Sequence, residues 1–250
     1  LLEAGKEVKA RGGQVALINA LWQENPKDWA HLIRDLNIVS CRDSRSAELL
    51  SNETGRTIKM IGDMSMATPP PQSNSIRNGI VFGDSVHSLI TRRLADLSNG
   101  HEGSQLLPVT SSLKFIDPAL SGFRRSLRSS YARWRQRQYL ARYSNAHFAP
   151  NEAAYISTLN RKELSVTGRF HAVCLAIATM TPFVAISSNS WKIEALLQDV
   201  GLRADRIKAL DDLDSTSLEP ANWTFDEAER NSIEAQLTDW SRQTDILFEE

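Results

Sequence analysis

Short apolar runs alternate with helix-like segments along residues 14–61, and this alternation limits the possible folds more than any other feature. The runs at 14–19, 38–41 and 57–61 are short, apolar and rich in β-branched residues. Residues 25–36 and 44–51, which lie between them, are typical of helices. A strand–helix order of this kind predicts a parallel sheet covered by helices.

The same alternation resumes after a break at 66–78, which holds three consecutive prolines and no apolar periodicity. We expect further strands at 79–82, 105–109, 164–167 and 182–186, and helices at 85–97, 120–143, 169–179 and 190–200. The predicted organisation is a partial N-terminal α/β lobe (1–66), a linker (67–78), a C-terminal α/β lobe (79–220) and a C-terminal helix (221–250). Thr224 and Glu227 fit a capping box at the start of that last helix.

Composition excludes several classes of protein. The 250 residues carry 29 basic and 30 acidic side chains, so the net charge of −1 argues against a protein that mainly coats nucleic acid or membranes. Cys41 and Cys174 fit neither a disulfide framework nor a zinc site, and no cluster has metal-ligand spacing, so we expect no metal and no cofactor. The apolar stretch 172–186 is too short to span a membrane, and a reducing, cytoplasmic location is predicted.

Charge is nevertheless unevenly distributed. Seven arginines and no acid lie between residues 122 and 142, whereas 203–250 has a local net charge of −8. The arginines could form a solvated face, attract a lipid-linked or acidic glycan, or pair with the acidic segment. Aromatic residues between arginines also occur in nucleic-acid binders, but no nucleic-acid fold is recognisable, so no nucleic-acid partner is predicted. Peripheral association with the inner face of the membrane stays open.

Polar and basic side chains follow two predicted strands in segment 164–202. One strand ends at Gly168 and is followed by Arg169 and His171, which open a helix. Since functional groups collect at the carboxyl ends of parallel strands, we expect a crevice for a small phosphate or carboxylate ligand. The side chains expected to converge there are Arg169, His171, Asn189, Ser190 and Lys192. The alternative is that the histidine is a hydrogen-bonded helix-start residue and the lysine is solvated.

This segment resembles the polysaccharide pyruvyl transferase family. The resemblance lies in T-G-R-F-H-A at 167–172, T-P-F at 181–183 and S-N-S-x-K-I at 188–193. A second element, I-V-S-C-R-D-S-R-S at 38–46, is similar to the strand of that family that runs into R-(D/E)-x-x-S. Asp63 is similar to the acid that often closes the first lobe. The resemblance covers roughly residues 14–202.

The resemblance implies two Rossmann-like lobes, as in GT-B glycosyltransferases, with the active site in a cleft. It also implies phosphoenolpyruvate as the donor, a glycan or lipid-linked sugar as the acceptor, and a pyruvate ketal as the product. Arg42, Arg169 and His171 match positions for donor binding and catalysis, and Lys192 matches a further donor-binding lysine. Members of the family usually begin with a further strand and a glycine-rich turn, so we expect a truncated N-terminal lobe.

The expected chemistry assigns a role to each matched residue. His171 would be the acid/base, Arg42 and Arg169 would hold the anionic groups from opposite lobes, and Lys192 would neutralise the departing phosphate. The predicted substrate-binding set also contains Phe170, Asn189, Ser190 and Asp63. Two other functions stay open: a nucleotide-sugar glycosyltransferase of the same fold, with Glu194 near the sugar nucleotide, and a non-catalytic anion- or glycan-binding module. Arg42 could instead belong to a surface ion-pair network.

Overall fold

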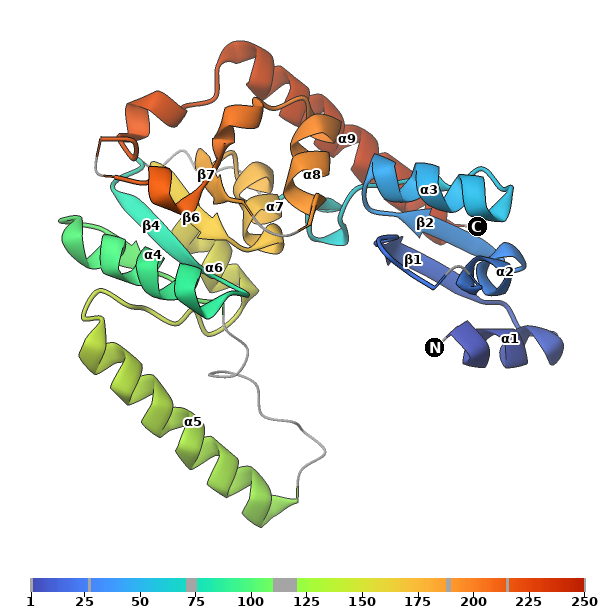
Figure 1. The fold of residues 1–250 in the computed structure, drawn as a ribbon, viewed down its shortest axis with the longest axis horizontal. Coiled ribbons are helices and arrows are strands. Elements are labelled where there is room, and N and C mark those ends of the chain that lie inside the picture. Colours follow the sequence, from blue (N-terminus) through green and yellow to red (C-terminus); the bar gives the residue numbers. More distant parts are fainter. Residues whose placement is uncertain are drawn as a thin grey trace. The chain divides into compact units, whose positions relative to one another are not determined.

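The computed structural model describes residues 2–26, 28–70, 76–109, 121–187, 190–214 and 216–249 (Figure 1). The chain forms two compact units. Unit 1 consists of Leu1–Pro69, Ser190–Ala204 and Asp226–Glu250, and unit 2 of Pro70–Asn189 and Asp205–Phe225. Each unit is therefore assembled from segments that are distant in the sequence.

Unit 1 is built on a three-stranded parallel sheet with the strand order β1 (Ala16–Ala20), β2 (Ile38–Cys41), β3 (Lys59–Met60). Helix α1 (Leu2–Ala10) precedes β1, and α2 (Trp29–Arg34) and α3 (Ser44–Thr54) connect the strands. Apolar residues of the strands and connecting helices form its core, among them Ile33, Val39, Leu50 and Ile58. Strand β1 lies at the edge of this sheet, next to an apolar cavity of about 590 Å³.

Helices α8 (Lys192–Val200) and α9 (Glu227–Glu249) also belong to unit 1. Helix α8 contacts both α3 and α9, and Asp199 of α8 accepts a hydrogen bond of 2.9 Å from the backbone N–H of Ser44 at the start of α3. The Trp240 ring of α9 covers Gly62 so closely that a Cβ there would lie 2.3 Å from it. The apolar face of α8 is thus buried within unit 1, whereas the sequence had assigned residues 79–220 to the second lobe as one block.

Unit 2 contains a five-stranded parallel sheet with the strand order β5-β4-β6-β7-β8. The strands are β4 (Ile80–Ser85), β5 (Gln105–Leu106), β6 (Leu164–Gly168), β7 (Phe183–Ile186) and β8 (Ile207–Lys208). Every residue of β4, β6 and β7 is buried, as expected of parallel strands that are covered on both faces.

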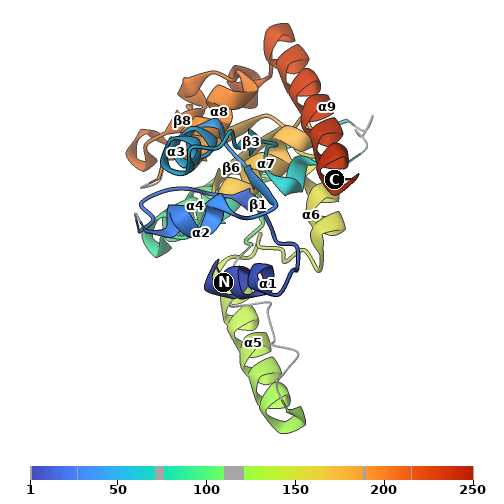
Figure 2. The same cartoon turned by 90° about the vertical axis from the view of Figure 1, so that its right-hand side faces the viewer.

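In the described part of unit 2, four α-helices accompany this sheet: α4 (Ser88–Gly100), α5 (Gly122–Arg142), α6 (Glu152–Leu159) and α7 (Phe170–Ala178). Figures 1 and 2 both show α5 extending away from the sheet of unit 2. Its carboxyl end is held by Tyr139 and Tyr143, which contact the core cluster formed by the strands, whereas Ala132 is its one buried residue.

The predicted fold class is confirmed: the chain is α/β with parallel sheets, and each expected strand and helix corresponds to one in the structure. Helices α1 and α6 and strand β8 were not predicted. The predicted cap of α9 is wrong, because Asp226 accepts the hydrogen bond from the backbone N–H of Glu229, whereas the Thr224 hydroxyl donates to Ala221. No helix in the described part of the chain is long and apolar enough to cross a membrane.

Candidate functional site

The strand order of unit 2 reverses between β4 and β6. The connection through α4 leads from β4 to β5 on one side, and the connection through α7 leads from β6 to β7 on the other. In open parallel sheets, ligands bind outside the carboxyl ends of the two strands where the order reverses. The candidate site of unit 2 therefore lies after residue 85 and after residue 168.

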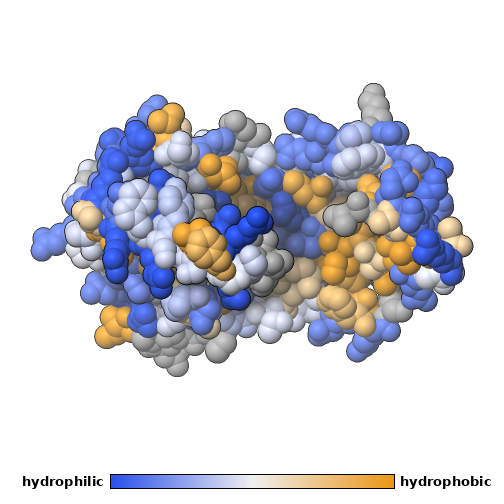
Figure 3. All heavy atoms as spheres, turned by 90° about the horizontal axis from the view of Figure 1, so that it is seen from below, coloured by the Kyte–Doolittle hydropathy of each residue, from blue (hydrophilic) through white to orange (hydrophobic). Residues whose placement is uncertain are grey.

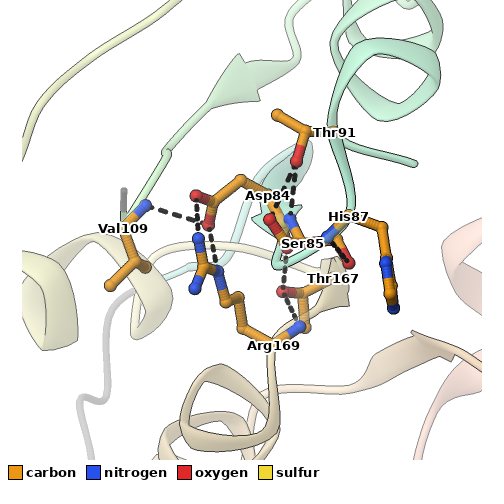
Figure 4. A network of polar contacts seen from close by, with 7 residues as sticks. All are labelled: Asp84, Ser85, His87, Thr91, Val109, Thr167 and Arg169. Carbon is orange, nitrogen blue, oxygen red and sulfur yellow. Dashed lines mark hydrogen bonds and ion pairs between the residues drawn. The ribbon is translucent and has the colours of Figure 1, made fainter. Parts of the chain in front are cut away.

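A buried ion pair joins these two strand ends (Figure 4). Asp84, whose side chain is fully buried, accepts hydrogen bonds from Nε of Arg169 at 3.1 Å and from its Nη2 at 2.9 Å. The backbone N–H of Val109 donates a third bond of 3.0 Å to the same carboxylate. The Arg169 side chain remains 27% exposed, and Asp84 fixes its Nε and Nη2, so Nη1 can contact a ligand.

Short polar side chains stabilise the conformation of each of the two loops. Thr91 donates a hydrogen bond to the carbonyl of Ser85 and accepts one from its backbone N–H, both at 3.0 Å. The Thr167 hydroxyl accepts a bond of 3.1 Å from the backbone N–H of Arg169. Gly168 is required by close approach, because a Cβ at this position would lie 2.7 Å from Cβ of Ser85. The glycine of the T-G-R-F-H segment thus lets β4 and β6 meet beside the arginine.

Next to this ion pair lies a cavity of about 540 Å³, which we call the arginine cavity. Its walls come from the end of β4, the first turns of α4, the carboxyl half of α5 and the first residue after β6. The lining residues are Ser85, Val86, Ser88, Thr91, Arg92, Arg135, Gln138, Tyr139, Arg142, Tyr143 and Arg169.

The arginine cavity has the electrostatic character of an anion site. Among the described residues that line it, four are arginines and none is an acid. The first turn of α4 adds the partial positive charge of a helix N-terminus, since Ser88 and Thr91 both line the cavity. Burial, together with the neighbouring Tyr143 and Asp84, raises the pKa of Tyr139, so this phenol is neutral and can donate a hydrogen bond. The cavity can therefore hold a ligand with more than one anionic group.

The histidine predicted to catalyse lies near, but not in, the wall of this cavity. His171 is an exposed residue in the first turn of α7, two residues after Arg169, which is the N-cap of that helix. Its ring meets the Phe170 ring edge-on, with 5.5 Å between the centroids. Unit 2 thus brings Arg169, Phe170 and His171 to one strand end, with only Arg169 lining the arginine cavity.

In unit 1, the other predicted donor arginine also pairs with a buried aspartate. Nη1 of Arg42 lies 3.7 Å from Oδ2 of Asp63, and the two side chains are 11% and 1% exposed. Asp43 caps α3 by accepting a bond of 2.8 Å from the backbone N–H of Ser46. In the R-D-x-x-S segment, Asp43 and Ser46 thus have structural roles, and Arg42 is the residue that follows the strand.

The remaining predicted residues are distributed as follows. Ser190 and Lys192 belong to unit 1, and Asn189 lies outside the described residues. Arg42 and Arg169 belong to different units, so the prediction that they face each other across a cleft stays a prediction.

Sequence reasoning missed the residues that complete the site of unit 2. Ser85, Thr91 and Arg92 were assigned only to a helix, and Asp84 was assigned to no element. The signal was present, because Gly83-Asp84-Ser85 directly follows a buried apolar run, where polar side chains point to a site. Within the described residues, no group of three or more His, Cys, Asp or Glu side chains could hold a metal ion.

Comparisons with known proteins bear on the family and the fold of the chain. A model of the family described as polysaccharide pyruvyl transferase matches residues 22–190. No curated protein matches the chain. Among solved structures, a Listeria monocytogenes protein assigned as a UDP-N-acetylglucosamine 2-epimerase is similar with a TM-score of 0.58 and 12% identity, over 97% of this chain and 69% of that chain.

The glycotransferase of kitacinnamycin is similar with a TM-score of 0.48 and 9% identity, over 88% of this chain and 57% of that one. At these identities the structural likeness concerns the fold alone, which this chain shares with the epimerase structure. The family model covers more than half of the chain and includes both arginine-bearing segments, 38–46 and 167–172. The chain therefore belongs to the polysaccharide pyruvyl transferase family.

Proposed function

We propose that this protein transfers a pyruvyl group from phosphoenolpyruvate to a sugar of a polysaccharide and forms a pyruvate ketal. The observation that carries the proposal is the family match over residues 22–190, because it contains Arg42 and the Arg169–His171 segment. The arginine cavity supports it, since a carboxylate and a phosphate on neighbouring atoms need more than one cationic anchor.

In this proposal Arg169 binds one anionic group of the donor through its Nη1, while Asp84 holds its other nitrogens in place. Arg92 and the α5 arginines of the cavity neutralise the remaining charge. Arg42 and Lys192 contribute from unit 1. Asp63, which accepts a hydrogen bond of 3.0 Å from the backbone N–H of Ser65, orients Arg42.

The reaction needs three proton movements. The methylene carbon of phosphoenolpyruvate gains a proton, two sugar hydroxyls each lose one as their oxygens bond to the central carbon, and phosphate leaves with its bridging oxygen. His171 is proposed to carry one of these protons, because imidazole titrates near neutral pH and the residue stands beside the arginine that binds the donor.

The test is release of phosphate from phosphoenolpyruvate in the presence of galactosyl, glucosyl and mannosyl acceptors. His171→Gln should lower turnover by a factor of about 10² to 10⁴ while the fold is retained. His147→Gln is the matched control, because His147 is also exposed and lies in unit 2 but was not assigned to the site.

Three outcomes would contradict the proposal. Near-normal turnover of His171→Gln would refute the role of the histidine. If a nucleotide sugar protects the folded protein and phosphoenolpyruvate does not, a glycosyltransferase would be favoured. Glycan binding without any phosphate release would favour a non-catalytic binding module.

A further inference from the structure

Helix α5 carries an exposed apolar stripe. Phe123, Leu127, Tyr131 and Trp134 are spaced by four, four and three residues, so they lie on one face of the helix. Their exposed fractions are 76%, 56%, 58% and 50%. Tyr131 and Trp134 also contact each other, with 5.8 Å between the ring centroids. Large apolar side chains that are this exposed and this regularly spaced are typical of an interaction surface.

The stripe is bordered by arginines on both sides. Each residue advances about 100° around a helix, so Arg124 and Arg128, which directly follow Phe123 and Leu127, lie along one edge. Arg133 and Arg137 lie along the opposite edge of the stripe. Viewed from below, hydrophobic and strongly hydrophilic side chains stand next to one another over α5 (Figure 3).

None of these arginines is neutralised by the helix itself. Residues 122–142 contain seven arginines and no acid. The ion pairs found between described residues include those of Arg42, Arg169, Arg203 and Arg242, and none of them involves an arginine of α5. A solvated basic helix is normally interrupted by acids at helical spacing, so this arrangement calls for an anionic partner.

The combination of an apolar stripe and flanking arginines fits a lipid surface best. Phe, Leu and Trp enter the boundary between head groups and acyl chains, while arginine side chains extend to the phosphates on either side. Tyrosine and tryptophan are favoured at that depth. A second copy of α5 would place arginines against arginines, and a nucleic acid would leave Leu127 against a polar backbone.

We propose that α5 is an interfacial helix that binds the surface of an anionic lipid bilayer, with the stripe Phe123, Leu127, Tyr131 and Trp134 inserted between the head groups. The role goes beyond the transfer reaction, because it needs neither donor nor acceptor. The carboxyl end of α5 is anchored to the core of unit 2 through Tyr143, so the bound helix ties this unit to the surface.

The experiment is co-sedimentation of the full chain with vesicles of phosphatidylcholine alone or mixed with phosphatidylglycerol. We expect binding to the mixed vesicles that weakens as salt is added, and little binding to phosphatidylcholine alone. The double variant Phe123→Ser and Leu127→Ser should bind at least about tenfold more weakly. The matched control is Phe248→Ser, since Phe248 is 64% exposed but lies on the acidic α9.

Charge and insertion are measured separately. Arg124→Gln and Arg128→Gln should each weaken binding roughly fivefold at low salt and have little effect at high salt. Vesicles should shift the emission of Trp134 to shorter wavelength and protect it from aqueous quenchers. The difference between the wild-type protein and Trp134→Phe isolates this signal from the other tryptophans.

Several results would overturn the proposal. They are no binding to anionic vesicles at low salt, equal binding by the double serine variant and the wild-type protein, or an unchanged Trp134 signal. If the wild-type protein self-associates while the double serine variant is monomeric and binds vesicles equally well, the stripe is an interface with a second copy of the chain instead. Because phosphate release is measured without lipid, failure of this proposal leaves the proposed transferase activity untouched.

Discussion

Replacing the buried aspartate of unit 2 tests the ion pair that positions the candidate site. In Asp84→Asn the amide oxygen can still accept from the backbone N–H of Val109, but the amide nitrogen meets Nη2 of Arg169, donor against donor. Breaking a fully buried pair costs about 3–5 kcal/mol. Because the Arg169 side chain is 27% exposed and is partly solvated, we expect a loss of about 2–4 kcal/mol in the free energy of unfolding.

The matched control is Asp239→Asn. Asp239 pairs with Arg242 at 2.6 Å on α9, but the two side chains are 39% and 65% exposed. Exposed pairs contribute little, so we expect a loss of about 0.5 kcal/mol. Both variants are measured by urea unfolding followed by circular dichroism, with phosphate release as the functional readout.

A double-mutant cycle separates the ion pair from other effects of the substitution. If the cost of Asp84→Asn arises from the charge stranded on Arg169, then adding Arg169→Met should recover at least about 1 kcal/mol. The reasoning is refuted if Asp84→Asn costs no more than Asp239→Asn, or if the two substitutions at the site are additive.

Three further predictions concern unit 1. Gly62→Ala should lower the free energy of unfolding in urea by more than about 3 kcal/mol, because φ is +72° and the Cβ would lie 2.3 Å from Trp240. Gly55→Ala is the control: φ is +70° there, but the space around it is open, so it should cost only about 1 kcal/mol. Equal costs of the two substitutions would contradict this prediction. Burial raises the pKa of Cys41 to about 12, so this thiol should react with a thiol reagent at pH 8 only as fast as the chain unfolds, and rapid reaction in the folded state would refute it. Burial also raises the pKa of Asp199, so the folded state holds this proton more tightly than the unfolded chain and loses stability as pH rises above the ordinary value of 3.8. Asp199→Asn should remove that loss, and a difference in unfolding free energy that is independent of pH would contradict the assignment.

The parts of the fold that depend on local patterns could be predicted from the sequence. Strands β4, β6 and β7 are buried along their whole length, and each contains short apolar or β-branched residues that a strand–helix alternation makes recognisable. The position of Arg169 and His171 at a strand end followed from Gly168, which closes one such strand. Helix α5 was evident from its arginines and its length.

Features that depend on distant contacts could not be predicted. Asp84 and Arg169 are 85 residues apart, and nothing in either segment indicates that they pair. The assignment of α8 to unit 1 rests on its contacts with α3 and α9, which come from opposite ends of the chain. The cap of α9 was misplaced because Thr224 and Asp226 both fit the start of a helix, and only the backbone path selects between them.

The division of unit 1 into three chain segments affects how the protein must fold while it is being synthesised. Residues 1–69 leave the ribosome before unit 2, but the ring of Trp240 that covers Gly62 is made only after all of unit 2. Until then the apolar surfaces that later meet α8 and α9 lack their cover, and such surfaces bind chaperones or aggregate. We therefore expect unit 2 to become resistant to protease first in nascent chains, and unit 1 only when α9 has emerged.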